Sequence, residues 1–185
     1  MNHASLLTDK LQAAWQLAAL HHVGQRYSTP VKDVTLPYLT HLGAVLIEAQ
    51  SALRHEPALD PELTQVCAIL HDSLEDTDLD AGVIGTHFGD RVLAGVSALT
   101  KNEKLATKQK QMEDSLGRIL QQPPEVAAVK LCDRICNLGS PPEHWSADKI
   151  TAYRAEAEVI MERLGGVSKY LTNRLRTKID AYGIM

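Results

Sequence analysis

Residues 67–77 read CAILHDSLEDT, an apolar half that continues directly into a half rich in ionisable groups. The apolar half has the composition of a buried helix, and the residues before it supply a helix start. Asp60 is a suitable N-cap, Pro61 fits the first helical position, and Glu62 suits the first turn. The pattern therefore predicts a helix from about residue 61 to residue 76.

Ionisable side chains gather near the expected C-terminus of this helix. His71 and Glu75 are four residues apart, as are Asp72 and Asp76, so each pair would lie along one helix face. Carboxylates at a helix C-terminus oppose the helix dipole, at a cost of about 0.3–1 kcal/mol each when exposed, and they also repel one another. A bound cation would offset both costs. The alternative is a solvated helix end whose acids share no function.

Apolar residues recur at helical spacing along the rest of the chain, and Gly, Pro and capping residues separate the runs. These runs predict helices at about residues 4–23, 38–53, 80–87, 90–100, 101–121, 124–138, 147–164 and 169–182, the last two capped by Ser146 and Ser168. No sustained alternation of polar and apolar residues predicts a strand. We therefore expect an all-α fold, with residues 1–185 forming a single domain of about eight or more helices.

The composition is that of an ordinary soluble globular protein, with 44% hydrophobic residues, 23% charged residues and a formal net charge of −4. This mild acidity argues against a nucleic-acid partner bound through bulk positive charge. No apolar run approaches the length of a membrane span, so we expect no membrane partner. Cys67, Cys132 and Cys136 lie in apolar helical contexts without zinc-finger spacing, which favours a reducing cytoplasm. An oligomer is compatible with these features, which do not specify one.

Asp133 is an acid within the strongly apolar helix expected at residues 124–138. Burying an unpaired carboxylate costs several kcal/mol, so Asp133 needs a partner. Lys130 and Asn137 lie three and four residues from Asp133, and Arg134 is spaced in the same way from Lys130 and Asn137. One interpretation is an internal ion pair of Asp133 with Lys130 or Arg134, and the other is a ligand for a cation.

His41 falls on the first turn of the helix expected at residues 38–53, where a lone histidine is most simply a core residue. Its significance comes from the other candidates, His71, Asp72 and Asp133, because two imidazoles and two carboxylates from three helices suit Mn²⁺, Fe²⁺, Zn²⁺ or a mixture of them. Such a set leaves coordination positions open on a six-coordinate ion. A hydrolase needs an open position for water or a phosphate oxygen.

The order of His41, the His71-Asp72 pair and Asp133 resembles the HD superfamily of metal-dependent phosphohydrolases. Longer motifs are similar to the hydrolase domain of RelA/SpoT-type alarmone enzymes. These motifs are PYxxH at 37–41, HDxxEDT at 71–77, FG at 88–89 and VKLxDRxxNL at 129–138. The motif PExWS at 142–146, together with Tyr153, resembles the stand-alone small alarmone hydrolases, including the animal SpoT homologue. The resemblance covers about residues 10–165.

The resemblance implies an HD-type helical bundle and a small-molecule nucleotide substrate. The reaction would remove the 3′-pyrophosphate of guanosine tetra- or pentaphosphate and leave GDP or GTP, with one Mn²⁺ ion in the site. The implied metal ligands are His41, His71, Asp72 and Asp133. The implied catalytic pair is Glu75 and Asp76, beside the metal, where either carboxylate can take the proton of the attacking water. Lys130 and Asn137 would hold substrate, and Arg26 or Lys32 could hold the rest of the polyanion.

The loop at residues 24–37 departs from the family pattern. In the family this loop touches the nucleotide base and carries an Arg-Lys pair, whereas here the loop is longer and the pair is split or lost. Gly139 also stands where the family often has Arg. Two alternatives therefore accompany the alarmone hypothesis. One is the same chemistry on another nucleotide, such as NADPH or a 2′- or 3′-phosphorylated nucleotide, and the other is a metal-bound regulatory module without turnover.

Overall fold

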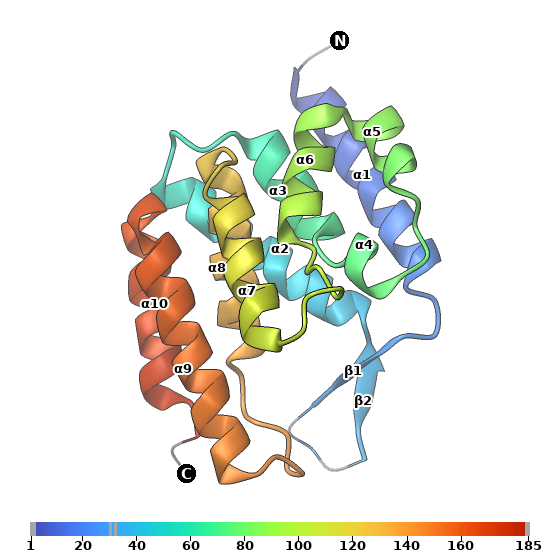
Figure 1. The fold of residues 1–185 in the computed structure, drawn as a ribbon. Coiled ribbons are helices and arrows are strands. Elements are labelled where there is room, and N and C mark those ends of the chain that lie inside the picture. The colour runs from blue at the N-terminus through green and yellow to red at the C-terminus, as the bar shows by residue number, and fades with distance from the viewer. Residues whose placement is uncertain (1–2, 30, 32, 184–185) are drawn as a thin grey trace.

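The computed structural model describes residues 3–29, 31 and 33–183, and nearly all of its regular structure is helical (Figure 1). The helices in chain order are α1 (His3–His21), α2 (Leu39–His55), α3 (Pro61–Leu70), α4 (Ser73–Asp76), α5 (Ala81–Phe88), α6 (Asp90–Leu99), α7 (Lys108–Ile119), α8 (Pro124–Asn137), α9 (Ala147–Leu164), the 3₁₀ turn η1 (Gly165–Val167) and α10 (Lys169–Ala181). The predicted all-α class, a bundle of about eight or more helices, is confirmed. No helix in the described residues is long and apolar enough to cross a membrane.

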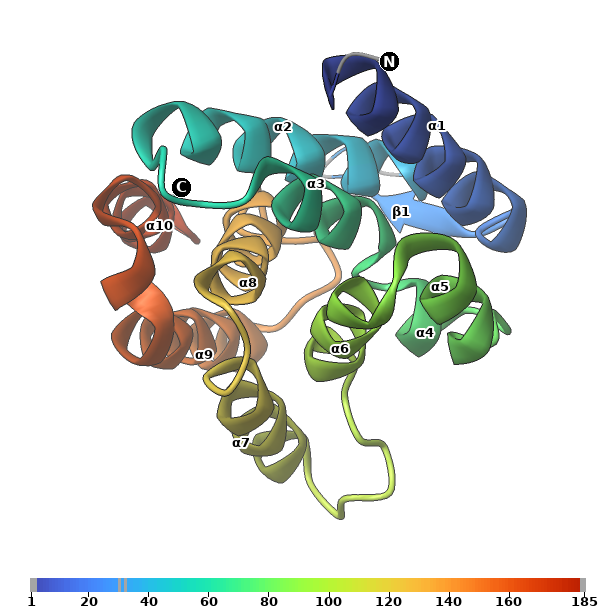
Figure 2. The ribbon, with the colours of Figure 1, turned by 90° about the horizontal axis from the view of Figure 1, so that it is seen from above.

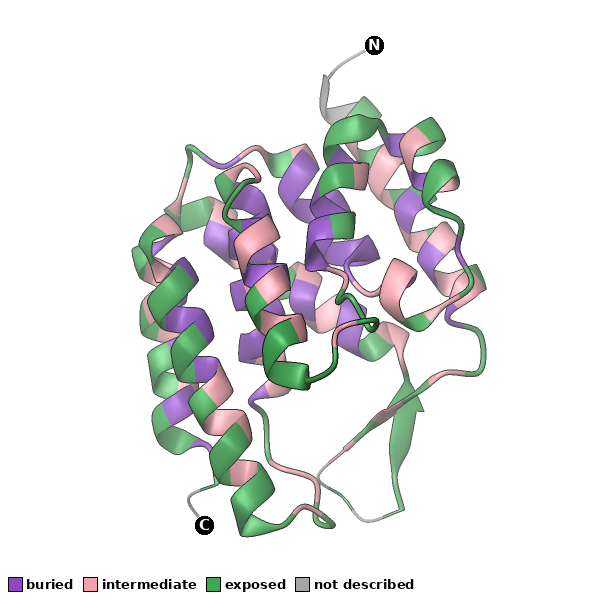
Figure 3. Ribbon diagram, in the orientation of Figure 1, coloured by how far each residue is buried: buried purple, intermediate pink, exposed green. Residues whose placement is uncertain are grey.

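Helix α8 lies at the centre of the bundle. Figure 2 shows α8 enclosed by α2, α3, α9 and α10, and the buried residues in Figure 3 gather on the faces that these helices turn toward one another. Buried side chains occur on most sides of α8, among them Val126, Val129, Leu131 and Ile135. A helix surrounded in this way is apolar on most of its faces, and its buried polar residues, such as Asp133, need partners.

Three of the predicted helix caps are present. Asp60 Oδ1 accepts from the backbone N–H groups of Glu62 and Leu63, at 2.9 and 3.2 Å, and Pro61 is the first residue of α3. The hydroxyl groups of Ser146 and Ser168 cap α9 and α10 in the same way. Each cap satisfies backbone donors that the first helical turn leaves without partners.

The prediction of a single helix from residue 61 to residue 76 is wrong, because α3 ends at Leu70 and α4 begins at Ser73. Asp72 has φ −100° and ψ −2° and stands at the N-cap position of α4. Glu75 and Asp76 therefore belong to the first turn of α4 instead of the last turn of a long helix. The expected conflict with the C-terminal dipole of a long helix is therefore smaller, because α4 has only four residues and few aligned peptide dipoles.

The segment at residues 24–37, predicted as a loop without strands, contains a hairpin. Strands β1 (Arg26–Ser28) and β2 (Thr35–Pro37) pair antiparallel, with Tyr27 opposite Leu36. Strands of three residues are too short to show alternation in a sequence, so only the pairing reveals them. Helix α7 also begins later than expected, at Lys108, where Thr107 supplies the cap.

Candidate metal centre

Side chains from three segments meet beside the start of α2. His41 comes from α2, His71 and Asp72 from the link between α3 and α4, and Asp133 from α8. His41 Nε2 lies 3.5 Å from Asp72 Oδ2 and 3.4 Å from Asp133 Oδ1. His71 Nε2 lies 2.9 Å from Asp72 Oδ2 and 3.8 Å from Asp133 Oδ1. The structure thus brings together all four residues that the sequence singled out as ligands.

His71 presents a lone pair to this cluster. The ring is 3% exposed, and its Nδ1 lies 2.9 Å from the carbonyl oxygen of Ala68. A carbonyl only accepts, so Nδ1 carries the hydrogen, and in the neutral ring Nε2 carries the lone pair. Nε2 is buried and has no well-oriented hydrogen-bond partner among the described residues, although Asp72 Oδ2 is close. A lone pair that faces a carboxylate oxygen requires a positive charge between them.

The electrostatics of the two imidazoles agree with this requirement. Burial by itself would lower the pKa of His41, but Asp133 and Asp72 outweigh it and raise the pKa to about 9. The pKa of His71 is also raised, since Asp72 and Asp133 outweigh the burial that opposes its charged form. The carboxylates therefore attract a proton or a cation to this point. His41, His71 and Asp133 each offer a ligand atom, and these atoms all lie within 4.8 Å of one another.

The internal ion pair that the sequence suggested for Asp133 is present, with Lys130 as its partner. Lys130 Nζ lies 2.9 Å from Asp133 Oδ2, and Asn137 Nδ2 donates to Asp133 Oδ1 at 2.5 Å. Arg134 turns elsewhere, with its guanidinium 4.3 Å from the ring centre of Tyr153. Burial opposes the charged form of Asp133, but Lys130, His41 and His71 together outweigh it and lower the pKa. Asp133 is an anion that Lys130 and Asn137 orient toward His41.

Tyr38 links the cluster to Asp76, and the sequence analysis gave it no role. Its hydroxyl lies 2.5 Å from Asp72 Oδ2 and 3.1 Å from Asp76 Oδ2, while Gln25 Nε2 lies 3.4 Å from the same Asp76 oxygen. Burial and the charge of Asp72 raise the pKa of Asp76. The position of Tyr38 three residues before His41 in the PYxxH motif is the signal that could have revealed it.

Glu75, the other expected catalytic acid, contacts Lys101, which lies just beyond the end of α6. Lys101 Nζ donates to Glu75 Oε1 at 2.6 Å. Sequence reasoning missed this lysine, because a separation of 26 positions leaves no periodic signal.

Arg26, one of the two cations expected to hold the substrate, is turned away from the cluster. The guanidinium of Arg26 bonds to the hydroxyl and carbonyl oxygens of Thr35, at 3.1 and 2.6 Å, so the structure does not bring Arg26 to the cluster. Lys32 lies outside the described residues. Tyr27, the next residue along β1, instead faces the site, where its hydroxyl donates to Asn137 Oδ1 at 3.3 Å.

Comparison with known proteins agrees with this geometry. Residues 38–138, more than half of the chain, match the family model described as HD domain. The chain belongs to the HD domain family. The range that matches in this HD-family protein starts three residues before His41 and ends five residues after Asp133, so it includes the whole cluster. The resemblance inferred from the sequence motifs is thereby confirmed.

Relatives of the HD-family chain include enzymes with curated names. It is 30% identical over 183 residues to the human protein named guanosine-3′,5′-bis(diphosphate) 3′-pyrophosphohydrolase MESH1, which covers 95% of this chain and 96% of the human protein. It is 33% identical over 141 residues to the guanosine-3′,5′-bis(diphosphate) 3′-pyrophosphohydrolase of Aquifex aeolicus. That alignment covers 75% of this chain and 18% of the Aquifex protein.

Solved structures share the same arrangement of helices. A structure described as a metazoan ortholog of SpoT that hydrolyzes ppGpp has a TM-score of 0.76 and 25% identity, over 92% of this HD-family chain and 94% of the other. The Listeria monocytogenes protein lmo0812 has a TM-score of 0.61 and 18% identity, over 78% of this chain and 96% of the other. The second match shows a common fold.

Proposed function

We propose that this HD-family protein hydrolyses the 3′-pyrophosphate of guanosine tetra- or pentaphosphate, releasing pyrophosphate and leaving GDP or GTP. The observation that carries the proposal is the buried meeting point of His41, His71, Asp72 and Asp133, in a chain aligned over 96% of the length of a human relative named for this reaction. A divalent cation held at such a meeting point would suit water attack on a polyanionic phosphate.

The donor set fits one divalent cation, for which we propose Mn²⁺ held by His41, His71, Asp72 and Asp133. The lone pair on His71 Nε2 has no well-oriented partner among the described residues, which is the condition that a metal would relieve. Two imidazoles and two carboxylates also suit Fe²⁺ or Zn²⁺, so the choice of ion is tested below. When bound, such an ion acidifies water and neutralises phosphate charge.

The adjacent carboxylates Glu75 and Asp76 would take the proton that water loses as it attacks. A raised pKa brings Asp76 closer to the working pH, which makes a carboxylate a better proton acceptor. Tyr38 stays protonated, because burial and Asp72 raise the pKa of its hydroxyl, so it remains a donor that holds Asp76 beside Asp72. The backbone N–H groups of Glu75 and Asp76 both bond to the carbonyl oxygen of Asp72, so the two acids lie one turn beyond this proposed ligand.

The remaining expected residues would bind the phosphates of the substrate. Lys130 and Asn137 both donate hydrogen bonds to Asp133, which holds their side chains beside the cluster. From there each would contact a substrate phosphate. Arg26 is exposed, and to bind a phosphate oxygen it would have to break its hydrogen bonds to Thr35. We propose that Lys32 also binds a phosphate of the substrate.

A side-by-side assay tests the function. Purified protein, stripped of metal and reloaded with Mn²⁺, Fe²⁺ or Zn²⁺, is given guanosine tetraphosphate, NADPH or a 3′-phosphorylated nucleotide, and products are separated by anion exchange. We expect GDP and pyrophosphate in equal amounts, fastest with Mn²⁺, and none after chelation. Turnover of another nucleotide with guanosine tetraphosphate inert would refute the substrate. Metal binding without turnover of any nucleotide would favour a regulatory module.

We also propose a cytoplasmic location for the chain. The cysteines Cys67, Cys132 and Cys136 are all free thiols, and such thiols persist most readily in a reducing compartment. Fractionation of cells that express a tagged chain would test this, and recovery in an oxidising compartment would contradict it.

A further inference from the structure

Glu75 is held at both carboxylate oxygens by a single residue from a distant segment. Lys101 Nζ donates to Glu75 Oε1 at 2.6 Å, and the backbone N–H of Lys101 donates to Glu75 Oε2 at 2.9 Å. The Glu75 side chain is 18% exposed. Two donors with fixed spacing keep a carboxylate in one orientation, whereas one donor would allow it to rotate. Each oxygen keeps a further lone pair that can accept a proton.

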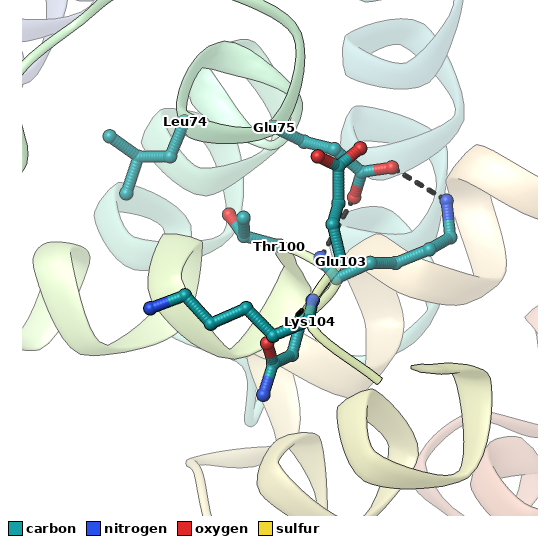
Figure 4. Close-up of a pocket in the computed structure, with 7 residues that line it drawn as sticks. Leu74, Glu75, Thr100, Glu103 and Lys104 are labelled. Atoms are coloured by element: carbon teal, nitrogen blue, oxygen red, sulfur yellow. Dashed lines mark hydrogen bonds and ion pairs between the residues drawn. The ribbon is translucent and has the colours of Figure 1, made fainter. Parts of the chain in front are cut away.

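This two-point contact lies in a cavity of about 410 Å³ between α4 and the segment that follows α6. Leu74 and Glu75 line one side, and residues 100–104 line the other. In Figure 4 the carboxylate of Glu75 points into the cavity, and dashed lines mark its contacts. A water or phosphate that enters this cavity therefore meets the acid that is expected to take a proton.

The segment that carries Lys101 is itself braced. The guanidinium of Arg118, in α7, makes three hydrogen bonds to the last turn of α6. The acceptors are the carbonyl oxygens of Ser97, Ala98 and Thr100, at 2.5, 3.1 and 2.7 Å. These carbonyls are among those that a helix end leaves without backbone partners. The backbone N–H of Lys101 is thus presented from a rigid support and not from a free loop.

The neighbouring acid is held differently. Asp76 accepts from the hydroxyl of Tyr38 and the amide of Gln25, which are both neutral donors. Lys101 brings a full positive charge to Glu75. The pKa of Lys101 is raised because Glu75, and then Asp133 and Asp72, outweigh the burial that would lower it. The ammonium group therefore stays charged within electrostatic reach of the cluster.

We propose that Lys101 is a positioning residue that holds the carboxylate of Glu75 in the orientation in which it accepts the proton of the attacking water. This inference rests on the proposed function, in which Glu75 is one of the two proton acceptors. Lys101 acts through Glu75 and needs no contact with substrate. Its removal should therefore slow turnover without weakening substrate binding.

The test is a double-mutant cycle on the Mn²⁺-loaded protein. Lys101→Met should lower kcat by about 10- to 100-fold, while KM stays within about twofold. This loss is smaller than the full contribution of a general base, because Glu75 itself remains. Lys101→Arg keeps the charge and the backbone N–H and should recover most of the loss. In a Glu75→Gln background, Lys101→Met should change kcat by less than about twofold, because the group through which it acts is gone.

Lys110→Met is the matched control, since Lys110 is an exposed lysine of α7 that does not line the cavity, and its ammonium has no ion pair among the described residues. It should leave kcat unchanged. Thermal unfolding of the four cycle proteins gives a second readout that needs no substrate, and the effects of the two changes should again be non-additive. Additive losses, or a rise in KM alone, would overturn the inference. Failure of the unmodified protein to hydrolyse guanosine tetraphosphate would instead refute the proposed function, and the inference with it.

Discussion

The ring of Tyr27 stacks on the imidazole of His41, with ring centroids 5.1 Å apart and 14° between the ring planes. The hydroxyl of the same tyrosine donates to Asn137 Oδ1, and Asn137 in turn donates to Asp133. The hairpin thereby reaches two proposed metal ligands by separate routes, one through a ring face and one through a hydrogen-bond chain. Groups that orient metal ligands in this way tune the affinity of the site.

Asn137→Ala should weaken Mn²⁺ binding by about 10- to 100-fold, as expected when an outer partner of a metal ligand is lost. The reason is that Asp133 loses the donor to its Oδ1 oxygen. Tyr27→Phe removes only the hydroxyl and keeps the ring stack, so its effect should be smaller. Titration calorimetry on the metal-free variants measures both. Unchanged affinity in Asn137→Ala would show that Asp133 is oriented without this chain.

Asp133→Asn should weaken metal binding more than it destabilises the fold. The amide keeps the shape of the side chain but removes the charge that faces His41. At a Mn²⁺ concentration of about 100 times Kd, the ion should stabilise the unmodified protein by about 2.7 kcal/mol, and this gain should vanish in the variant. Elemental analysis and thermal unfolding with and without Mn²⁺ provide the check. Equal metal content in the two proteins would count against Asp133 as a ligand.

Asp60→Asn tests the pH dependence of a helix cap. Burial opposes the charged form of Asp60, but the N–H of Leu63, Arg91 and the N–H of Glu62 together lower its pKa. A group whose folded pKa is depressed contributes stability above its unfolded pKa and loses it as pH falls through the folded value. The variant should therefore be less stable by about 0.3–1 kcal/mol at pH 7, and the difference should be smaller at about pH 2, below the ordinary Asp pKa of about 3.9. Urea unfolding at both pH values measures the difference, and an equal gap at both would exclude a charge effect.

Arg118→Met should destabilise the protein by about 1.5–3 kcal/mol, the range for hydrogen bonds to a charged group. Its guanidinium donates to the carbonyl oxygens of Ser97, Ala98 and Thr100, of which Ala98 would keep a bond from the Ser115 hydroxyl. Arg154→Met is the control, because Arg154 only approaches Glu158 at 4.0 Å on the surface of α9. Chemical denaturation should show little change for the control. A loss of the same size in both variants would mean that the brace at α6 adds nothing specific.

The local signals in the sequence were sufficient for most of the helices. Helical periodicity and caps depend on residues within about one turn of each other. The N-terminal starts of α3, α9 and α10 follow from their capping residues Asp60, Ser146 and Ser168. The motifs also identified the four candidate ligands before any contact was known. Neither the break after Leu70 nor the hairpin at Tyr27 has a comparable local signal. The break contains no Gly or Pro, and the paired strands are only three residues long.

The amino-acid order by itself determined the helical class, the identities of His41, His71, Asp72 and Asp133, and the presence of two acids one turn beyond them. Tertiary structure decided which partners those side chains have. It turned Arg26 toward Thr35, placed Tyr27 on His41 and brought Lys101 to Glu75 across 26 residues. The physical reason is that periodicity reports which face of a helix is buried, whereas a pairing between distant polar groups depends on how whole helices pack.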